Sequence, residues 1–367
     1  MVNKYPIKYL TIKGFQSIKN LEKFNLTNLN VLIGPNGAGK SNFVTYFDML
    51  NRLVEQDLQE WVTKRGGADR LLTFGIKETK ELMSHVHFGS NGYQFSLEPT
   101  DEGSFVFTDE LLFYQDRYPD GYSIGSGHRE AYLIDDVDFN QPYRMANYTY
   151  ASISSWKIYH FHDTSDTAGV KRFGSIDDTR FLRRDGSNLA AFLYRMRQDD
   201  RDTYDLIRRT VQLAIPFFDD FILEPRNLSS DDQQIRLLWR QRNSDYPMWP
   251  TQLSDGSIRF ICLATALLQP DPPSTIIIDE PELGLHPFAI TLLASLMRSA
   301  STQTQLIIST QSVPLLNEVS LEDIIVVERE DEVSVFKRLD QHDFESWLED
   351  YTVGELWEKN VLGGKPK

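Results

Sequence analysis

The chain has 367 residues, 41% of them hydrophobic and 25% charged, which is enough to bury a sizeable core in one composite domain of two lobes. It has no apolar run as long as a membrane span and begins without the apolar core of a signal peptide, so we expect neither a membrane protein nor a secreted one. The net charge of −15 argues against a surface covered with nonspecific nucleic-acid contacts. The single cysteine, Cys262, predicts a packing role in a reducing cytoplasm.

The first chemically specific segment is a hydrophobic stretch at residues 29–33 that runs into a glycine-rich loop. The spacing matches G-x-x-x-x-G-K-[ST], in which glycines let backbone N–H groups turn toward a phosphate. We expect Lys40 to reach the β- and γ-phosphates of ATP and the Ser41 hydroxyl to bind Mg²⁺. The residues expected to bind the nucleotide here are Asn36, Gly37, Ala38, Gly39, Lys40, Ser41 and Asn42.

The middle of the chain predicts a β-rich segment followed by a helical one. Residues 80–160 are rich in aromatic and β-branched residues and are broken by Gly and Pro, which predicts an antiparallel sheet lobe. A helical pattern covers residues 186–215, and residues 234–242 predict a strand. No sustained heptad occurs, so we expect no long coiled coil.

Two features of this middle segment allow more than one interpretation. His-x-His pairs at positions 85/87 and 160/162 could each offer a metal two ligands, but half-buried strand histidines are the preferred interpretation because further ligands are not evident. A series of arginines could face phosphates or an acidic partner, although the interspersed aspartates favour solvated, ion-paired helix faces. These arginines are Arg180, Arg183, Arg184, Arg195, Arg197, Arg208, Arg209, Arg236, Arg240 and Arg242.

An acidic pair, Asp279 and Glu280, ends the apolar stretch at residues 274–278. Such a stretch predicts a buried parallel strand that delivers both carboxylates to the edge of the sheet where ligands bind in open α/β folds. We expect Asp279 to bind Mg²⁺ and Glu280 to be the general base for the water that attacks the γ-phosphate. The alternative, an ordinary strand ending in a solvated acidic turn, is disfavoured by the phosphate loop upstream.

The segment Leu-Ser-Asp-Gly-Ser-Ile-Arg at residues 253–259 resembles the L-S-x-G signature of ABC-type ATPases, and a helix-like run follows it at residues 260–268. Read alone, it is a turn or a helix cap. In that family two heads dimerise head to tail. The resemblance therefore implies a homodimer in which Ser254 and the Gly256 backbone of one subunit bind the γ-phosphate held by the other.

Other segments resemble the RecF-, SMC- and OLD-like members of this class. Residues 11–18 and Asn42 are similar to the corresponding parts of these ATPases, although Gln16 stands where many of them have a basic residue. The strand predicted at residues 305–310 ends where the family places a γ-phosphate-sensing histidine, and this chain has Gln311 there. The resemblance implies that Gln311 takes part in catalysis as a neutral sensor.

The fold class implied is α/β, an ABC-type P-loop ATPase head with a mixed sheet core, flanking helices and a compact inserted lobe. We expect an N-terminal ATPase lobe with the phosphate loop at 1–79, a β-rich then helical inserted lobe at 80–249, and a C-terminal ATPase lobe with the signature, acidic pair and switch at 250–367. Residues 344–358 predict a helix packed on the core, with a protein-docking surface as the second option.

The chain resembles the stand-alone ATPase subunits of bacterial antiviral systems such as Septu and PARIS. The resemblance implies a cytoplasmic ATPase that dimerises on ATP and regulates a separate effector, a nuclease or a toxin, because residues 281–367 leave no room for a nuclease domain. A RecF-like DNA-binding clamp in DNA repair is the alternative, favoured by the middle arginines and disfavoured by the acidic net charge. The nucleotide-binding subunit of a transporter is the least favoured function. The segment between the phosphate loop and the signature is much longer here than in such subunits.

Overall fold

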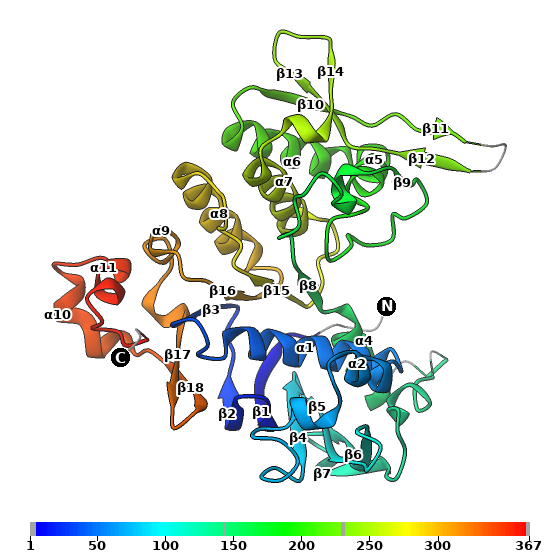
Figure 1. Cartoon of the computed structure of the whole chain (residues 1–367), viewed down its shortest axis with the longest axis vertical. Helices are drawn as coiled ribbons and strands as arrows, with labels where there is room; N and C mark the ends of the chain where they lie inside the picture. The colour runs from blue at the N-terminus through cyan, green and yellow to red at the C-terminus, as the bar shows by residue number, and fades with distance from the viewer. Residues whose placement is uncertain (1–4, 139, 142–143, 229–231, 365–367) are drawn as a thin grey trace.

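A mixed six-stranded sheet forms the centre of the molecule, in the order β18-β17-β3-β16-β15-β8 (Figure 1). The computed structural model describes residues 5–138, 140–141, 144–228 and 232–364. Within the sheet all neighbouring strands pair in parallel except β18, which is antiparallel to β17. The strands are β3 (Leu29–Ile33), β8 (Lys157–Tyr159), β15 (Thr275–Asp279), β16 (Gln305–Ser309), β17 (Ile324–Glu330) and β18 (Val333–Arg338).

A second six-stranded sheet is antiparallel and has the order β2-β1-β4-β5-β6-β7. It joins strands from both sides of residue 80, because β1 pairs with β4. Helix α1 (Lys40–Val54) lies between the two sheets (Figure 1). The strands are β1 (Ile7–Phe15), β2 (Ile18–Asn25), β4 (Leu82–Phe88), β5 (Asn91–Pro99), β6 (Phe105–Tyr114) and β7 (Tyr118–Gly125).

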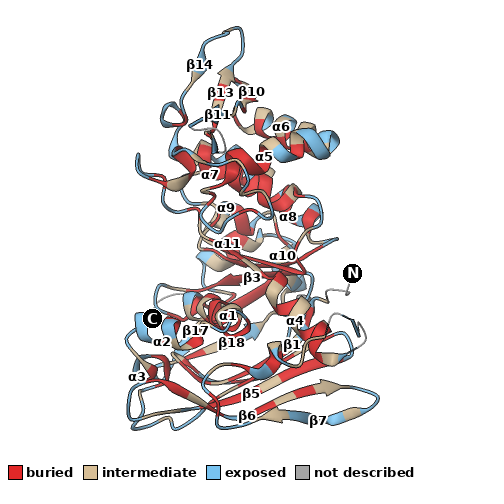
Figure 2. Ribbon diagram, turned by 90° about the vertical axis from the view of Figure 1, so that its right-hand side faces the viewer, coloured by how far each residue is buried: buried red, intermediate tan, exposed pale blue. Residues whose placement is uncertain are grey.

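The mixed sheet is buried on both faces, as its continuous apolar strands require. In β15, Ile276 and Ile278 pack into one hydrophobic core and Ile277 into the other, the alternation expected of a strand. The second core lies toward α1 and the antiparallel sheet, and the first lies toward a helical layer (Figure 2). That layer contains α5 (Leu189–Asp199), α6 (Arg201–Ala214), α7 (Asp255–Leu268) and α8 (Pro287–Ala300).

The remaining elements are short and lie around these layers. Two small three-stranded sheets accompany α5 and α6 at one end of the molecule (Figure 1). The single helix predicted over residues 344–358 is two short helices, α10 and α11. Leu356 of α11 is fully buried on the core, whereas Trp347 of α10 is exposed. These elements are α2 (Leu58–Lys64), α3 (Ala68–Leu71), α4 (Met145–Ser155), α9 (Val313–Leu316), α10 (Glu345–Leu348), α11 (Val353–Glu358), β9 (Gly174–Ser175), β10 (Phe218–Ile222), β11 (Arg226–Asn227), β12 (Gln233–Ile235), β13 (Leu238–Gln241) and β14 (Pro247–Met248).

The α/β fold class with a mixed sheet and flanking helices is confirmed, but three local predictions are wrong in part. The helical pattern at 186–215 divides into α5 and α6, because Asp200 caps α6 by accepting the N–H of Thr203. The strand predicted at 234–242 divides into β12 and β13, which pair in different sheets. The antiparallel lobe predicted at 80–160 ends at β7, and residues 145–155 form helix α4 despite their Tyr, Thr and Ile content.

Five of the ten middle arginines have carboxylate partners among the described residues. Arg184 lies 3.2 Å from Asp48 and Arg240 lies 2.7 Å from Asp219, and further pairs join Arg183, Arg195 and Arg208 to aspartates. The ion-paired interpretation of this segment is therefore supported by the geometry. None of the helices in the described part of the chain has the length and apolar character that crossing a bilayer requires.

Candidate nucleotide-binding site

The glycine-rich loop lies between the end of β3 and the start of α1, at the carboxyl edge of the mixed sheet. Gly34 and Gly39 have φ values of 150° and 112°. A Cβ atom on Gly34 would lie 2.1 Å from the carbonyl oxygen of Val327, and one on Gly39 would lie 1.9 Å from the hydroxyl of Ser334. Both positions therefore need glycine for backbone conformation and for space.

A chain of hydrogen-bonded hydroxyl and amide groups holds the backbone of this loop in place. The Ser334 hydroxyl donates to the Ala38 carbonyl at 2.5 Å, so the hydroxyl of Ser17 must donate the 2.6 Å hydrogen bond that joins it to Ser334. Ser17 in turn accepts from the Asn42 side chain at 2.6 Å. Sequence reasoning missed Ser17 and Ser334 as supports, because they lie 317 positions apart in the chain.

Lys40 is 6% exposed and its ammonium group donates to the carbonyl oxygens of Gly34 at 2.6 Å and Pro35 at 3.1 Å. Burial lowers its pKa, and the field of nearby carboxylates opposes that effect. These carboxylates belong to Asp279, Glu280 and Glu282. Among the described residues, the hydrogen bonds of this buried cation go to carbonyl oxygens alone, so it is well placed to turn to a phosphate.

The end of β15 faces the start of α1. The Ser41 hydroxyl donates to Asp279 Oδ2 across 3.4 Å, which brings one carboxylate and one hydroxyl together beside the loop. Oxygen ligands of this kind suit Mg²⁺, which takes few protein ligands and completes its shell with water and phosphate. The two residues fit the proposed magnesium position. Among the described residues, no group of three or more His, Cys, Asp or Glu side chains could hold a metal ion.

Glu280 adopts an unusual backbone conformation with φ of 45° while its N–H donates to the carbonyl of Ser309 at 2.8 Å. Non-glycine residues rarely occupy this region, and they do so mainly where a site requires it. Gln311 connects Glu280 to the loop, because its side-chain amide donates to Asn36 Oδ1 at 2.6 Å and lies 3.3 Å from Glu280 Oε1. The structure thus brings the acidic pair, the loop and Gln311 together.

Glu282 was not singled out by sequence reasoning, although it lies in the run 281–287 that follows the acidic pair. One oxygen of its buried carboxyl accepts from the Thr310 hydroxyl at 2.6 Å and from the N–H of Gln311 at 3.2 Å, while Oε2 has no described hydrogen-bond partner. Burial raises the pKa of this carboxyl, and Glu280 adds to the shift. Glu282 therefore fixes the backbone from which Gln311 projects.

The signature segment begins α7. Ser254 is the N-cap residue, and its hydroxyl accepts the N–H of Ser257 at 3.1 Å. A Cβ atom on Gly256 would lie 2.2 Å from the carbonyl oxygen of Gly284, so the signature packs directly on the loop after Glu280. Within the described residues, no hydrogen bond joins Ser254 or Gly256 to the phosphate loop of the same chain.

Arg259 ties the signature helix to the same region. Its guanidinium donates to the carbonyl oxygen of Phe161 at 2.9 Å and also to that of Leu283. The His162 ring nitrogen Nε2 lies 2.9 Å from the carbonyl oxygen of Asp279, so this histidine is used in a hydrogen bond to the backbone beside the acidic pair. Burial lowers the pKa of His160 and lowers that of His85 to about 4. The interpretation as half-buried strand histidines holds for His85 and His87 on β4, whereas His160 and His162 follow the end of β8 and His162 is exposed.

Gln311→Ala is expected to lower ATP turnover while leaving ATP affinity nearly unchanged, because the amide would act mainly in the transition state. Steady-state kinetics and equilibrium binding on the same samples measure the two effects. Since an amide does not titrate, the rate should show no step near pH 6.5 attributable to this position. Unchanged turnover in the alanine variant would mean that Gln311 only stabilises the loop and takes no part in catalysis.

Comparison with known proteins gives a family and a fold. A family profile described as "AAA domain, putative AbiEii toxin, Type IV TA system" matches residues 29–317. No curated protein matches the chain by sequence. The structure resembles an SMC head domain bound to the C-terminal winged-helix domain of ScpA, with 16% identity, a TM-score of 0.63 and coverage of 93% of this chain and 99% of that one.

A second similar structure is the SMC head domain with an extended coiled coil bound to the C-terminal domain of ScpA, derived from Pyrococcus furiosus. Its identity is 14% and its TM-score 0.57, and the match covers 94% of this chain and 99% of that one. The fold is therefore that of an SMC-like head, without a long coiled coil: the longest helix in the described part is α1, with 15 residues. By the extent of its profile match, the chain belongs to the AAA-domain family that includes AbiEii-like proteins.

Proposed function

We propose that the chain binds and hydrolyses ATP with Mg²⁺ and that ATP closes two copies into a head-to-tail dimer. The observation that carries this proposal is the meeting of the phosphate loop, the Asp279–Glu280 pair and Gln311 at one edge of the mixed sheet. Membership of an AAA-domain family supports nucleotide binding.

Each group has a distinct task in this proposal. Lys40 turns from its two carbonyl partners to the β- and γ-phosphates, and the start of α1 adds a favourable dipole. Ser41 and Asp279 hold Mg²⁺, which would neutralise charge on the phosphates. Glu280 accepts a proton from the attacking water, and Gln311 orients that water or the γ-phosphate. The nucleotide contacts assigned to the loop are those of residues 36–42.

In the proposed dimer, the signature segment of the partner copy completes each nucleotide site. Ser254 and the Gly256 backbone stand at the N-terminus of α7, an anion-binding position. Gly256 packs on Gly284, and the Arg259 guanidinium donates to the carbonyl of Leu283. A movement of the signature would therefore displace the segment that follows Glu280. This coupling is a physical route by which dimer closure could complete the hydrolytic site.

We further propose that the ATP-bound dimer is the active state of a cytoplasmic sensor that regulates a separate effector, a nuclease or a toxin, in defence against phage. The description of the matched family names a putative toxin of a toxin–antitoxin system, which supports a functional link between this chain and a toxin. The DNA-clamp alternative gains little from the structure, because many of the middle arginines are paired with carboxylates.

The test compares two tagged forms purified from the native host. Glu280→Gln should retain ATP and the dimer and enrich one effector protein, whereas Lys40→Ala should not, and mass spectrometry identifies what is bound. Recovery of the same proteins with both forms would argue against an ATP-dependent partnership. Recovery of DNA with Glu280→Gln and no protein would favour the clamp.

A further inference from the structure

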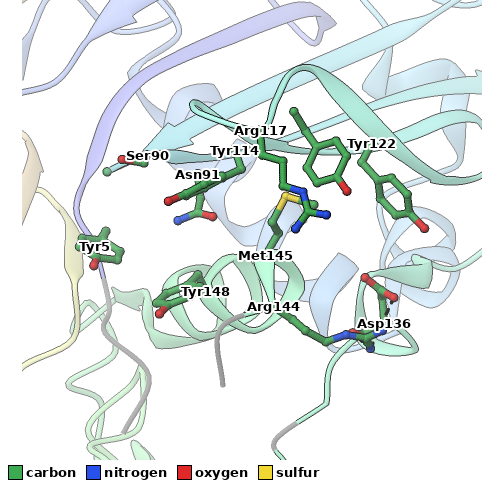
Figure 3. A pocket seen from close by; sticks show the side chains of 12 residues that line it. Tyr5, Ser90, Asn91, Tyr114, Arg117, Tyr122, Asp136, Arg144, Met145 and Tyr148 are labelled. Atoms are coloured by element: carbon green, nitrogen blue, oxygen red, sulfur yellow. Dashed lines mark hydrogen bonds and ion pairs between the residues drawn. The ribbon is translucent and has the colours of Figure 1, made fainter. Parts of the chain in front are cut away.

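A pocket of about 650 Å³ lies away from the nucleotide site, between α4 and the strands β5, β6 and β7 (Figure 3). None of the residues that line it belongs to the phosphate loop, the acidic pair or the signature. Its volume is in the range of small-molecule sites, which are commonly 300–1,000 Å³. The pocket therefore has room for a ligand about the size of a nucleotide.

Aromatic rings dominate its walls. Tyr118 and Tyr122 come from β7, with ring centroids 5.6 Å apart, and Tyr148 comes from α4, with its ring 6.2 Å from that of Tyr5. Figure 3 shows Tyr122 on the strand side of the pocket and Tyr148 on the helix side. Tyr122 is exposed and Tyr148 is half-buried, and the two rings on opposite sides of the cavity offer stacking surfaces for a flat ring.

The pocket also carries a positive charge that is not neutralised within the described residues. Arg117, in the turn between β6 and β7, is exposed, forms no ion pair with a described carboxylate, and lies 5.4 Å from the ring of Tyr118. The second arginine, Arg144, lies 3.7 Å from the carboxylate of Asp136 and donates to its carbonyl at 3.0 Å. Arg117 is therefore the group available to a phosphate.

A buried amide completes the site. Asn91 is 6% exposed, begins β5, and its side chain lines the pocket. No hydrogen bond joins this side chain to another described residue, and its amide nitrogen and oxygen are accessible from the pocket that it lines. An amide offers one acceptor and two donors side by side, which matches the edge of a nucleobase.

We propose that this pocket binds one nucleotide unit, with its base stacked on the tyrosines, its base edge at Asn91 and its phosphate at Arg117. The chemistry is the same for a free nucleotide and for one residue of a single-stranded nucleic acid. An acidic peptide would use Arg117 but would leave the stacking faces and the buried amide without suitable partners. The site is separate from ATP hydrolysis and does not depend on the function proposed above.

The probes are thymidine 5′-monophosphate and a hexathymidylate strand, titrated by calorimetry into the Lys40→Ala chain so that the phosphate loop contributes little. Tyr122→Ala and Arg117→Glu are each expected to weaken binding by about tenfold or more, since stacking and charge-assisted contacts both have that size. Matched controls are Tyr246→Ala and Arg242→Glu, which make the same changes at exposed positions outside the pocket. Both controls should bind like the parent.

The two probes separate the two sources of the ligand. Equal affinity for monophosphate and strand identifies a free nucleotide, whereas tighter strand binding with a steep salt dependence identifies single-stranded nucleic acid. Asn91→Leu should weaken binding while Asn91→Gln keeps part of it. Failure of both probes to bind, equal losses in the control variants, or binding of a tyrosine phosphopeptide in their place would overturn the proposal.

Discussion

Replacing Glu280 by glutamine is expected to lower ATP turnover by about 100-fold or more while ATP binding stays close to that of the parent chain. The substitution removes the proton acceptor but keeps the shape of the side chain and its reach to Gln311, 3.3 Å away. The backbone N–H of residue 280 would keep its bond to the Ser309 carbonyl, so the unusual φ of 45° should persist. Phosphate release and nucleotide binding on the same sample measure the two quantities.

Glu282→Gln is the matched control for this experiment, since it makes the same chemical change two residues away. Glu282→Gln keeps a side-chain oxygen that can accept from the Thr310 hydroxyl and the Gln311 N–H, so it should disturb the site far less than loss of the proton acceptor at Glu280. Lys40→Ala supplies the opposite pattern, in which binding itself is lost. Wild-type turnover in Glu280→Gln would mean that the base assignment is wrong.

The parts of the fold that could be predicted from sequence are those whose signals are local. The continuous apolar runs that became β3, β15 and β16 predict buried strands because a parallel sheet covered on both faces needs little else. The split of residues 186–215 depended on one capping contact of Asp200, and the helix at 145–155 has a composition that favours strands. The cap is a local contact that the apolar pattern does not reveal, whereas tertiary packing against β5, β6 and α1 decided the helix at 145–155.

The candidate site likewise contains residues that the sequence predicts and residues that it does not. The phosphate loop and the acidic pair carry motifs with fixed spacing, and the structure places them together. The supports Ser17, Ser334 and Glu282 have no such motif, because their partners are distant in sequence and the contacts are set by how strands meet. The packing role of Gly256 could not be predicted from the sequence either. Only the structure shows that a side chain at this position would collide with the carbonyl oxygen of Gly284.

A mixture of Lys40→Ala and Ser254→Arg chains is expected to recover ATPase activity that neither variant has alone. In their heterodimer one composite site loses both groups, while the other keeps an intact loop and an intact signature. Random pairing makes half of the dimers mixed, each with one working site of two, so the mixture should reach about a quarter of parent activity if the sites act independently. Specific activity of the parent should also rise with protein concentration.

The Ser254→Arg chain must remain folded for this result to be interpreted. Ser254 caps α7, and loss of such a cap costs about 1 kcal/mol, which a domain with the large cores seen here can tolerate. Thermal unfolding of each variant checks this point, and two different affinity tags confirm that heterodimers have formed. Lys40→Ala mixed with the Lys40→Ala/Ser254→Arg double variant is the matched control, because its heterodimers contain no intact loop and should stay inactive. Confirmed heterodimers of the first mixture that hydrolyse no ATP would show that the signature does not act across the dimer.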